Sequence, residues 1–324
     1  MVGLIGWDLL TDKTFNKMSY LSKRLLGSKF NLRWKTKSSP IASLYTKLAY
    51  GEDKFVASDN GELFYSSDGI NWSLSPSFPI PDASGTFIFI AYGSGIFVSF
   101  MNQSGSSNAT DIVYSNDGLT WVKSANPLPV LPPYPSGWTS ITYGGGRFVA
   151  LASACNVAAY SNDGLTWTQT TISQAGWEAV TYGGGRFVAV AVGSSKAMYS
   201  NDGVTWIETV KPFGQERTIA YGNGKFISLS YNQGAIYSLD GITWAATGSS
   251  PGGLGFTAVT YGRNMFVAVK GPYFQYLGNY AAYSYDGINW VTTPLPLDLN
   301  MRAVVYGKGR FIAPDANGII AYTI

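Results

Sequence analysis

Few side chains in this sequence could do chemistry. It has no histidine, one cysteine (Cys155), and 22 basic against 19 acidic residues in 324. This composition excludes histidine-based nucleophilic catalysis, histidine metal sites, an internal disulfide and a cysteine-built zinc site. The net charge of +3, with no run of lysine or arginine, gives no footprint for nucleic acid. We therefore expect no metal, no cofactor and no nucleic-acid partner.

Four charged residues stand just before strands that we expect to line the centre of the fold: Glu178, Glu216, Arg217 and Arg302. Inward-facing groups at these positions could meet on a central axis. A glycosidase needs two carboxyl groups on defined sides of one bond, whereas guanidinium groups can bind hydroxyls without chemistry. The cluster leaves both interpretations open. We favour binding and predict that the protein is not an enzyme.

Aromatic residues in and beside the most variable loops form a second candidate surface, because a flat ring can cover the apolar face of a sugar. For the two tryptophans of this set the alternative is packing between repeats, which we favour. For the loop at 273–280 the alternative to ligand binding is that its aromatic side chains pack against one another. With three of the charged residues, the candidate binding residues are Tyr134, Trp138, Trp177, Glu216, Arg217, Tyr273, Phe274, Tyr276, Tyr280 and Arg302.

Seven copies of one unit must position these residues. Each copy has an apolar strand that ends in Tyr-Gly, and the average spacing of about 43 residues is that of a four-stranded propeller blade. The seven tyrosines are Tyr50, Tyr92, Tyr143, Tyr182, Tyr221, Tyr261 and Tyr306.

A second motif, Tyr-Ser-x-Asp-Gly-x-x-Trp, follows each of the first six Tyr-Gly pairs. Asp-Gly between apolar segments predicts a tight hairpin, in which Gly takes positive φ and Asp accepts hydrogen bonds from its own turn. In the third copy we expect strands at 139–143, 148–152, 157–161 and 165–170. We assign a structural role to the six aspartates, Asp68, Asp117, Asp163, Asp202, Asp240 and Asp286.

The seventh copy lacks the second motif and stops after a third strand. Residues 31–36, Asn-Leu-Arg-Trp-Lys-Thr, match the fourth-strand pattern of Gly-Leu-Thr-Trp-Val-Lys at 118–123. The N-terminal segment should therefore complete the last blade and leave no long free sheet edge. The sequence predicts an all-β, seven-bladed β-propeller of four-stranded blades, preceded by a short N-terminal helix.

The second motif resembles the Asp-box of bacterial-neuraminidase-type (BNR) repeats, which usually has one more residue between Asp and Gly. The resemblance covers residues 30–324 and implies that the box is a structural hairpin away from the ligand face. A sialidase of that type would need an arginine cluster, a Tyr–Glu pair and a further acidic residue on the central axis. Arg147, Arg186 and Arg310 stand at a repeated turn position, which already explains them.

Residues 1–29 form a separate segment before the propeller at 30–324. Residues 11–27 have a helical pattern, which is either packed on its own domain or a docking element for another chain, with a membrane-surface helix as a weaker third option because its basic face is short. We see no signal peptide and no transmembrane stretch. The low charge and the abundance of Tyr, Ser, Thr, Asn and Gly resemble extracellular β proteins, yet we find no export signal and expect no disulfide. A virion protein that is made in the host cytoplasm satisfies both observations, and the architecture resembles phage tail, fibre or decoration proteins.

We therefore expect a virion protein that contacts other virion proteins through residues 1–29. Its variable loops would recognise a host-surface glycan or protein, because recognition usually lies on loops that vary over a fixed scaffold. The alternatives are an adaptor role in the virion, a lectin-like module outside a virion, and a sialidase-like hydrolase.

Overall fold

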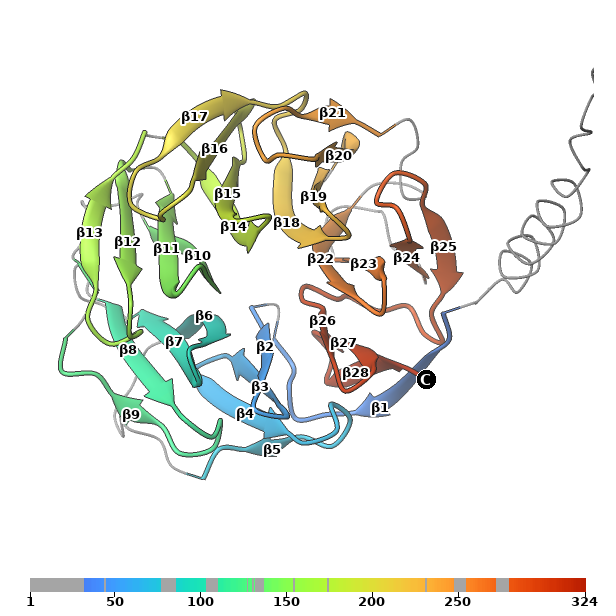
Figure 1. Cartoon of the computed structure of the whole chain (residues 1–324). Helices are drawn as coiled ribbons and strands as arrows, with labels where there is room; N and C mark the ends of the chain where they lie inside the picture. The colour runs from blue at the N-terminus through green and yellow to red at the C-terminus, as the bar shows by residue number, and fades with distance from the viewer. Residues whose placement is uncertain are drawn as a thin grey trace, which may run out of the picture. The chain divides into compact units, whose positions relative to one another are not determined.

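The computed structural model describes seven antiparallel sheets of four strands each, arranged as a ring (Figure 1). No helix occurs within these described residues. The fold is the predicted all-β, seven-bladed β-propeller, and the helix expected over 11–27 lies outside the described residues. The structure describes residues 32–43, 45–76, 86–102, 110–126, 128–129, 131, 137–153, 155–173, 175–230, 232–247, 255–271 and 280–324.

Each of the first six blades is a meander whose strands follow one another in chain order. Blades 1 to 3 consist of β2 (Lys47–Gly51), β3 (Lys54–Asp59), β4 (Glu62–Ser66), β5 (Ser73–Leu74); β6 (Thr86–Gly93), β7 (Ile96–Asn102), β8 (Thr110–Ser115), β9 (Val122–Lys123); β10 (Gly137–Gly144), β11 (Arg147–Ser153), β12 (Val157–Ser161), β13 (Thr168–Thr171). Blades 4 to 6 consist of β14 (Trp177–Gly183), β15 (Arg186–Ala191), β16 (Lys196–Ser200), β17 (Ile207–Val210); β18 (Glu216–Gly222), β19 (Lys225–Ser230), β20 (Gly234–Ser238), β21 (Ala245–Ala246); β22 (Phe256–Gly262), β23 (Met265–Lys270), β24 (Tyr280–Ser284), β25 (Val291–Pro294). Blade 7 consists of β26 (Val305–Gly307), β27 (Arg310–Asp315), β28 (Ile319–Thr323) and β1 (Trp34–Ser38).

The fourth strand of blade 3 begins at Thr168, later than the expected start at 165, because the residues before it belong to the Asp-Gly turn. Both recurrent turns join strands at one face of the ring, which we call the turn face. The connections between second and third strands and the links between blades form the opposite loop face.

The core lies between neighbouring blades. One cluster joins Val149 and Leu151 of blade 3 to Val180 and Phe187 of blade 4, and equivalent clusters join five further pairs of neighbours. One of them joins Phe55 of blade 1 to blade 7 and so closes the ring. Each blade therefore buries its apolar faces only by having two neighbours.

The Tyr-Gly motif is a contact between blades as well as a turn. The ring of Tyr221 lies so close to Gly183 of the preceding blade that a Cβ added there would be 1.9 Å from the tyrosine Cγ. A side chain larger than hydrogen does not fit at such a position. The same contact recurs around the ring at Gly51–Tyr92, Gly93–Tyr143, Gly144–Tyr182, Gly222–Tyr261, Gly262–Tyr306 and Gly307–Tyr50.

The seventh blade is completed by the N-terminal strand, as predicted. β1 pairs with β28 from Trp34↔Thr323 to Ser38↔Ile319, and Trp34 is 6% exposed. Figure 1 shows β1 on the outside of this blade, next to the C-terminus of the chain. The first and last described strands thus share one sheet.

Candidate functional site

The innermost strands surround a central channel, which contains a cavity of about 200 Å³. Every blade contributes to its wall. One lining residue from each blade, in blade order, is Lys47, Phe89, Thr139, Glu178, Arg217, Thr257 and Arg302. These residues come from the beginning of the innermost strands, where the links between blades arrive, so they lie toward the loop face.

Bulges in the innermost strands present the charged residues. The pairing of β14 shifts at Glu178, and that of β18 shifts at Arg217. A bulge leaves one residue out of the ladder and re-aims its side chain. The preceding residues, Trp177 and Glu216, stay buried between blades while Glu178 and Arg217 line the channel.

Three basic side chains and one carboxylate face the cavity. Arg217 Nη1 lies 3.6 Å from Glu178 Oε1, and these side chains are 32% and 30% exposed. Burial raises the pKa of Glu178, although the charges of Arg217 and Lys47 oppose this rise. Burial lowers the pKa of Lys47, with Glu178 opposing and Arg302 adding to the effect. The four groups therefore contribute to one electrostatic potential in the channel, which is positive overall.

Hydroxyl groups on the channel wall tie neighbouring blades together at three of the junctions: blades 3 and 4, 5 and 6, and 6 and 7. Two threonine hydroxyls donate hydrogen bonds to backbone carbonyls of the next blade. One serine and one threonine hydroxyl accept hydrogen bonds from backbone amides of the next blade. The bonds are Thr139 Oγ1 to Trp177 O (2.8 Å), Thr257 Oγ1 to Met301 O (2.8 Å), Val180 N to Ser140 Oγ (3.2 Å) and Val259 N to Thr218 Oγ1 (3.2 Å). The charged groups thus stand on a wall that is cross-tied between blades.

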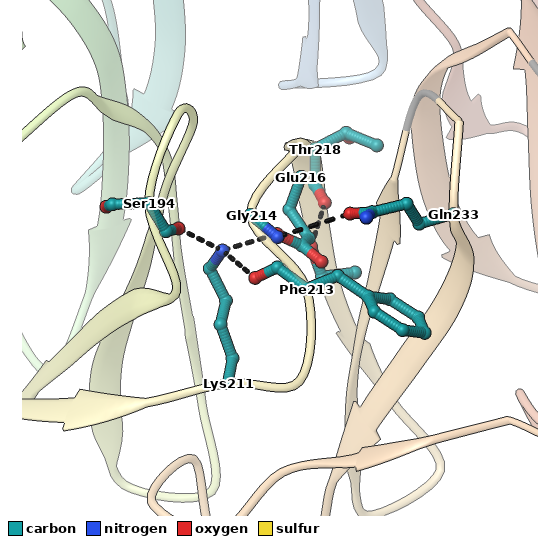
Figure 2. Close-up of polar contacts among 8 residues, drawn as sticks. Ser194, Lys211, Phe213, Gly214, Glu216, Thr218 and Gln233 are labelled. Atoms are coloured by element: carbon teal, nitrogen blue, oxygen red, sulfur yellow. Dashed lines mark hydrogen bonds and ion pairs between the residues drawn. The ribbon is translucent and has the colours of Figure 1, made fainter.

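Glu216 does not join the channel cluster, which corrects the expected grouping. Its side chain is fully buried in an ion pair with Lys211, which precedes β18 (Figure 2). Lys211 Nζ also donates to the carbonyl oxygens of Ser194 (2.9 Å) and Phe213 (2.7 Å). The bulge at Arg217 separates the two neighbours, so Glu216 points between blades 4 and 5. The Lys211 ammonium thereby joins the connection between β15 and β16 to the link that leads from β17 into β18, and Glu216 neutralises its charge there.

Trp138 and Trp177 are buried at 4% and 0% exposure. Trp138 packs edge-on against Phe100 of the neighbouring blade, with ring centroids 6.2 Å apart. Trp177 Nε1 donates to the carbonyl of Ser173 (2.7 Å). Neither indole presents a surface to a ligand, and packing between blades, the alternative favoured for them, describes both.

Tyr280 is half-buried, and its hydroxyl accepts from Lys270 Nζ at 2.8 Å. The same ammonium lies 4.3 Å from the centroid of the Tyr280 ring, a cation–π contact. The side chain of Tyr280 is therefore engaged within blade 6. The remaining aromatic candidates lie outside the described residues: Tyr134, Tyr273, Phe274 and Tyr276.

The Asp-Gly hairpins share the capping of the turn by the aspartate in all six copies, whereas the tryptophan hydrogen bond to the turn glycine is made by Trp72 and Trp167. In blade 1, Asp68 Oδ1 accepts from the amides of Ile70 and Asn71, both at 2.8 Å, and Gly69 has φ +76°. Trp72 Nε1 donates to the carbonyl of Gly69 at 3.1 Å. The corresponding carboxylates accept two amides of their own turn in every other copy: Asp117, Asp163, Asp202, Asp240 and Asp286. This geometry is the predicted capping of the turn.

These carboxylates make the stability of the fold depend on pH in the acid range. Burial alone would raise the pKa of Asp68 and Asp286, but hydrogen bonds from their turns outweigh it and lower each pKa to about 2. An unfolded Asp titrates near ~3.9. The stabilisation is therefore complete above about pH 4 and is lost as the pH falls toward about 2. We expect the thermal midpoint to drop steeply over this interval, and less steeply in Asp68→Asn. A midpoint that stays constant from about pH 5 to about pH 2 would contradict this role.

Arg147 and Arg186 brace the turn face. Their Nη1 atoms donate to the carbonyls of Asp202 (2.6 Å) and Asp240 (2.8 Å), each in the Asp-Gly turn of the next blade. Each guanidinium also lies over a tyrosine of its own blade, at 5.2 and 5.3 Å from the ring centroid. Their repeated position thus serves the scaffold, as the turn pattern indicated.

Among the described residues, no group of three or more acidic, histidine or cysteine side chains is placed to hold a metal ion. No helix in this part of the chain is long and apolar enough to cross a membrane.

Sequence reasoning missed Lys47 and Lys211. Lys47 lies three residues before the tyrosine of its copy, whereas Arg217 and Arg302 lie four before theirs. A bulge in one strand and not another is not visible in the spacing alone. Lys211 stands in a link that varies between copies, and the only signal for it was its place shortly before Glu216.

Comparisons with known proteins support the fold. No protein-family model matches the chain, and no curated protein matches it. Among solved structures, a catalytically inactive histidine-to-alanine variant of virginiamycin B lyase from Staphylococcus aureus with quinupristin superimposes with a TM-score of 0.69 at 10% identity, over 90% of this chain and 100% of that chain. YCF48 bound to D1 peptide gives 0.67 at 13% identity, over 90% and 94%. BamB from Moraxella catarrhalis gives 0.58 at 8% identity, over 85% and 81%.

At these identities the likeness shows the propeller fold and nothing finer. The neighbours comprise an enzyme, a protein bound to a peptide and BamB, so they span catalysis and binding on one architecture. The comparisons therefore establish the propeller fold of this chain and leave its role to be argued from its own residues.

Proposed function

We propose that this chain is a non-enzymatic binding propeller of a virion that recognises a host-surface glycan or protein. One observation carries the binding role: a cross-tied channel whose wall presents three basic groups and one carboxylate among hydroxyl and aliphatic side chains. Such a set attracts and orients a ligand. It offers a single carboxyl group among the described residues, whereas hydrolysis by a carboxyl pair uses two.

The absence of histidine adds to the non-enzymatic proposal. The Staphylococcus aureus lyase is inactive when one histidine is changed to alanine, and this chain has no histidine to fill that role. The repeated aspartates, tyrosines and arginines are engaged in hairpins and blade contacts. Recognition is thus left to the channel and the loop face.

The virion assignment rests on two arguments: a composition typical of extracellular β proteins, with 13% charged residues and 38 glycines, and an architectural resemblance to phage tail and fibre proteins. In this proposal residues 1–29 contact other virion proteins, and the propeller faces the host. A lectin-like module outside a virion is the alternative, and the same channel would serve it.

We expect deletion of residues 1–27 to abolish incorporation into particles while the purified protein keeps its thermal midpoint and its binding to host cells. The truncated protein should keep its thermal midpoint because β1 begins only at Trp34, so the ring of blades stays complete. The measurement is immunodetection of the protein in purified particles, with the full chain as control. Particles that still carry the truncated protein would refute the anchoring role of residues 1–29.

The non-enzymatic role has its own test. Release of sugar from a bacterial surface polysaccharide, lost in Glu178→Gln, would refute it.

A further inference from the structure

Building on the proposed binding function, we propose that the channel receives an acidic side chain of a protein partner, with Glu178 as a built-in competitor for Arg217. Lys47, Arg217 and Arg302 come from blades 1, 5 and 7, far apart in sequence, and line one cavity. A narrow cleft of one charge sign concentrates its field and attracts the opposite charge. Guanidinium and ammonium donors hold an anionic oxygen group such as a carboxylate with charge-assisted hydrogen bonds, which are stronger than neutral ones.

The chemistry of the wall favours an acidic amino-acid side chain over a sugar ring. A pyranose is usually held by an uncovered aromatic face together with amide groups. The described lining has neither Trp, Tyr, Asn nor Gln. Its one aromatic residue, Phe89, has the Lys47 ammonium 5.6 Å from its ring centroid. Aliphatic residues such as Ile141 and Val180 make up much of the rest, and they suit the methylene stem of a glutamate.

Glu178 limits the binding of such a group. Its Oε1 is 3.6 Å from Arg217 Nη1, longer than the ~2.7–2.9 Å of a charge-assisted hydrogen bond, so this internal pair is a loose one. A ligand carboxylate that approaches Arg217 meets the like charge of Glu178. The charged groups that act on Glu178 are Arg217 on β18 and Lys47 on β2, with Arg302 at the cavity wall beyond them. Protonation of Glu178 removes the competing charge and should strengthen binding.

The test uses the full chain and a fluorescein-labelled hexaglutamate peptide, followed by fluorescence anisotropy at low salt. We expect Arg217→Gln and Arg302→Gln to weaken binding about tenfold each, and Glu178→Gln to tighten it by about threefold to tenfold. Lys225→Gln is the matched control, because it removes the same charge from the turn face; it should change affinity less than about twofold. Thermal melts establish that every variant is folded.

The pH dependence is a second readout. Because burial raises the pKa of Glu178 above that of the peptide carboxyl groups, binding should tighten as the pH falls, until the peptide itself becomes protonated and binding weakens. Glu178→Gln should lack this response. A wild-type affinity that is independent of pH, or a response unchanged in Glu178→Gln, would overturn the role of Glu178.

Two further measurements, binding of tetragalacturonate and binding to host cells, distinguish failure of this inference from failure of the proposed function. If tetragalacturonate binds through Arg302 and hexaglutamate does not, the channel is a glycan site and the protein-partner proposal is overturned, whereas recognition of the host surface stands. Binding to host cells that is unaffected in Arg217→Gln and Arg302→Gln likewise overturns the channel proposal alone. Hexaglutamate binding that depends on Arg302, in a protein that binds no host surface, supports the channel and refutes the proposed function.

Discussion

Removal of residues 1–38 is expected to lower the thermal midpoint of the propeller by more than about 10 °C, because the ring then loses the strand that completes its last blade. β1 pairs with β28 at five residue pairs, and Trp34 buries nearly its whole side chain. Loss of a buried Trp side chain alone costs about 3–5 kcal/mol. For a chain of this size about 1 kcal/mol corresponds to roughly 1.5 °C in the midpoint, so the loss of the Trp34 side chain accounts for about half of the expected drop and the lost strand pairing for the rest. The exposed edge of β28 should also promote aggregation.

Deletion of residues 1–30 is the matched control, since it removes most of the same segment and leaves β1 in place. Its midpoint should stay within about 2 °C of the full chain. Trp34→Ala separates the side chain from the strand and should fall between the two deletions. A deletion of 1–38 that melts like the deletion of 1–30 would show that closure does not depend on β1.

Most of the fold could be predicted because its signals are local and repeated. Asp68 and Gly69 specify their hairpin with atoms of the same turn, so spacing alone reveals it. The match of residues 31–36 to a fourth strand predicted the pairing of Trp34 with the last strand correctly. The function of Tyr-Gly as an interlock between blades was not predictable in this way, because the tyrosine contacts the glycine of a different copy.

The candidate site could be predicted only in part, because it depends on register. Glu178, Arg217 and Arg302 meet in the channel as the sequence indicated, but Glu216 does not. A one-residue shift reverses the face on which a strand presents its side chains. The bulge at Arg217 therefore decides that this residue lines the channel while its neighbour pairs with Lys211, and no signal in the sequence marks the bulge.

The residues of the repeated motifs and the charged residues of the channel should have different roles. Substitutions in the Tyr-Gly and Asp-Gly motifs should act on stability, because their side chains contact other blades or their own turns. Substitutions of Lys47, Arg217 or Arg302 should act on binding, because these side chains are half-buried at a cavity. A buried pair such as Lys211 and Glu216 belongs with the first kind, although its residues are charged.

Gly183→Ala is the sharpest test of the interlock between blades, and we expect it to destabilise the protein by about 3 kcal/mol or more. The added Cβ would lie 1.9 Å from Tyr221 Cγ and 2.2 Å from Cδ1, so the ring or the two blades must move apart. Overpacking of a tight core typically costs ~1–3 kcal/mol, and here the clash involves a ring fixed in a packed strand. In guanidinium unfolding the midpoint should fall, with a corresponding loss in the thermal melt.

A double-mutant cycle with Tyr221→Ala shows whether the clash is the cause. Without the ring the new methyl group has room, so the double variant should be more stable than the sum of the single effects predicts by at least about 1 kcal/mol. Gly137→Ala is the control: Gly137 also belongs to an innermost strand, and its added Cβ meets no described atom within 4 Å. That variant should change stability by less than about 0.5 kcal/mol. Additive effects of Gly183→Ala and Tyr221→Ala would mean that the glycine serves the turn and not the contact between blades.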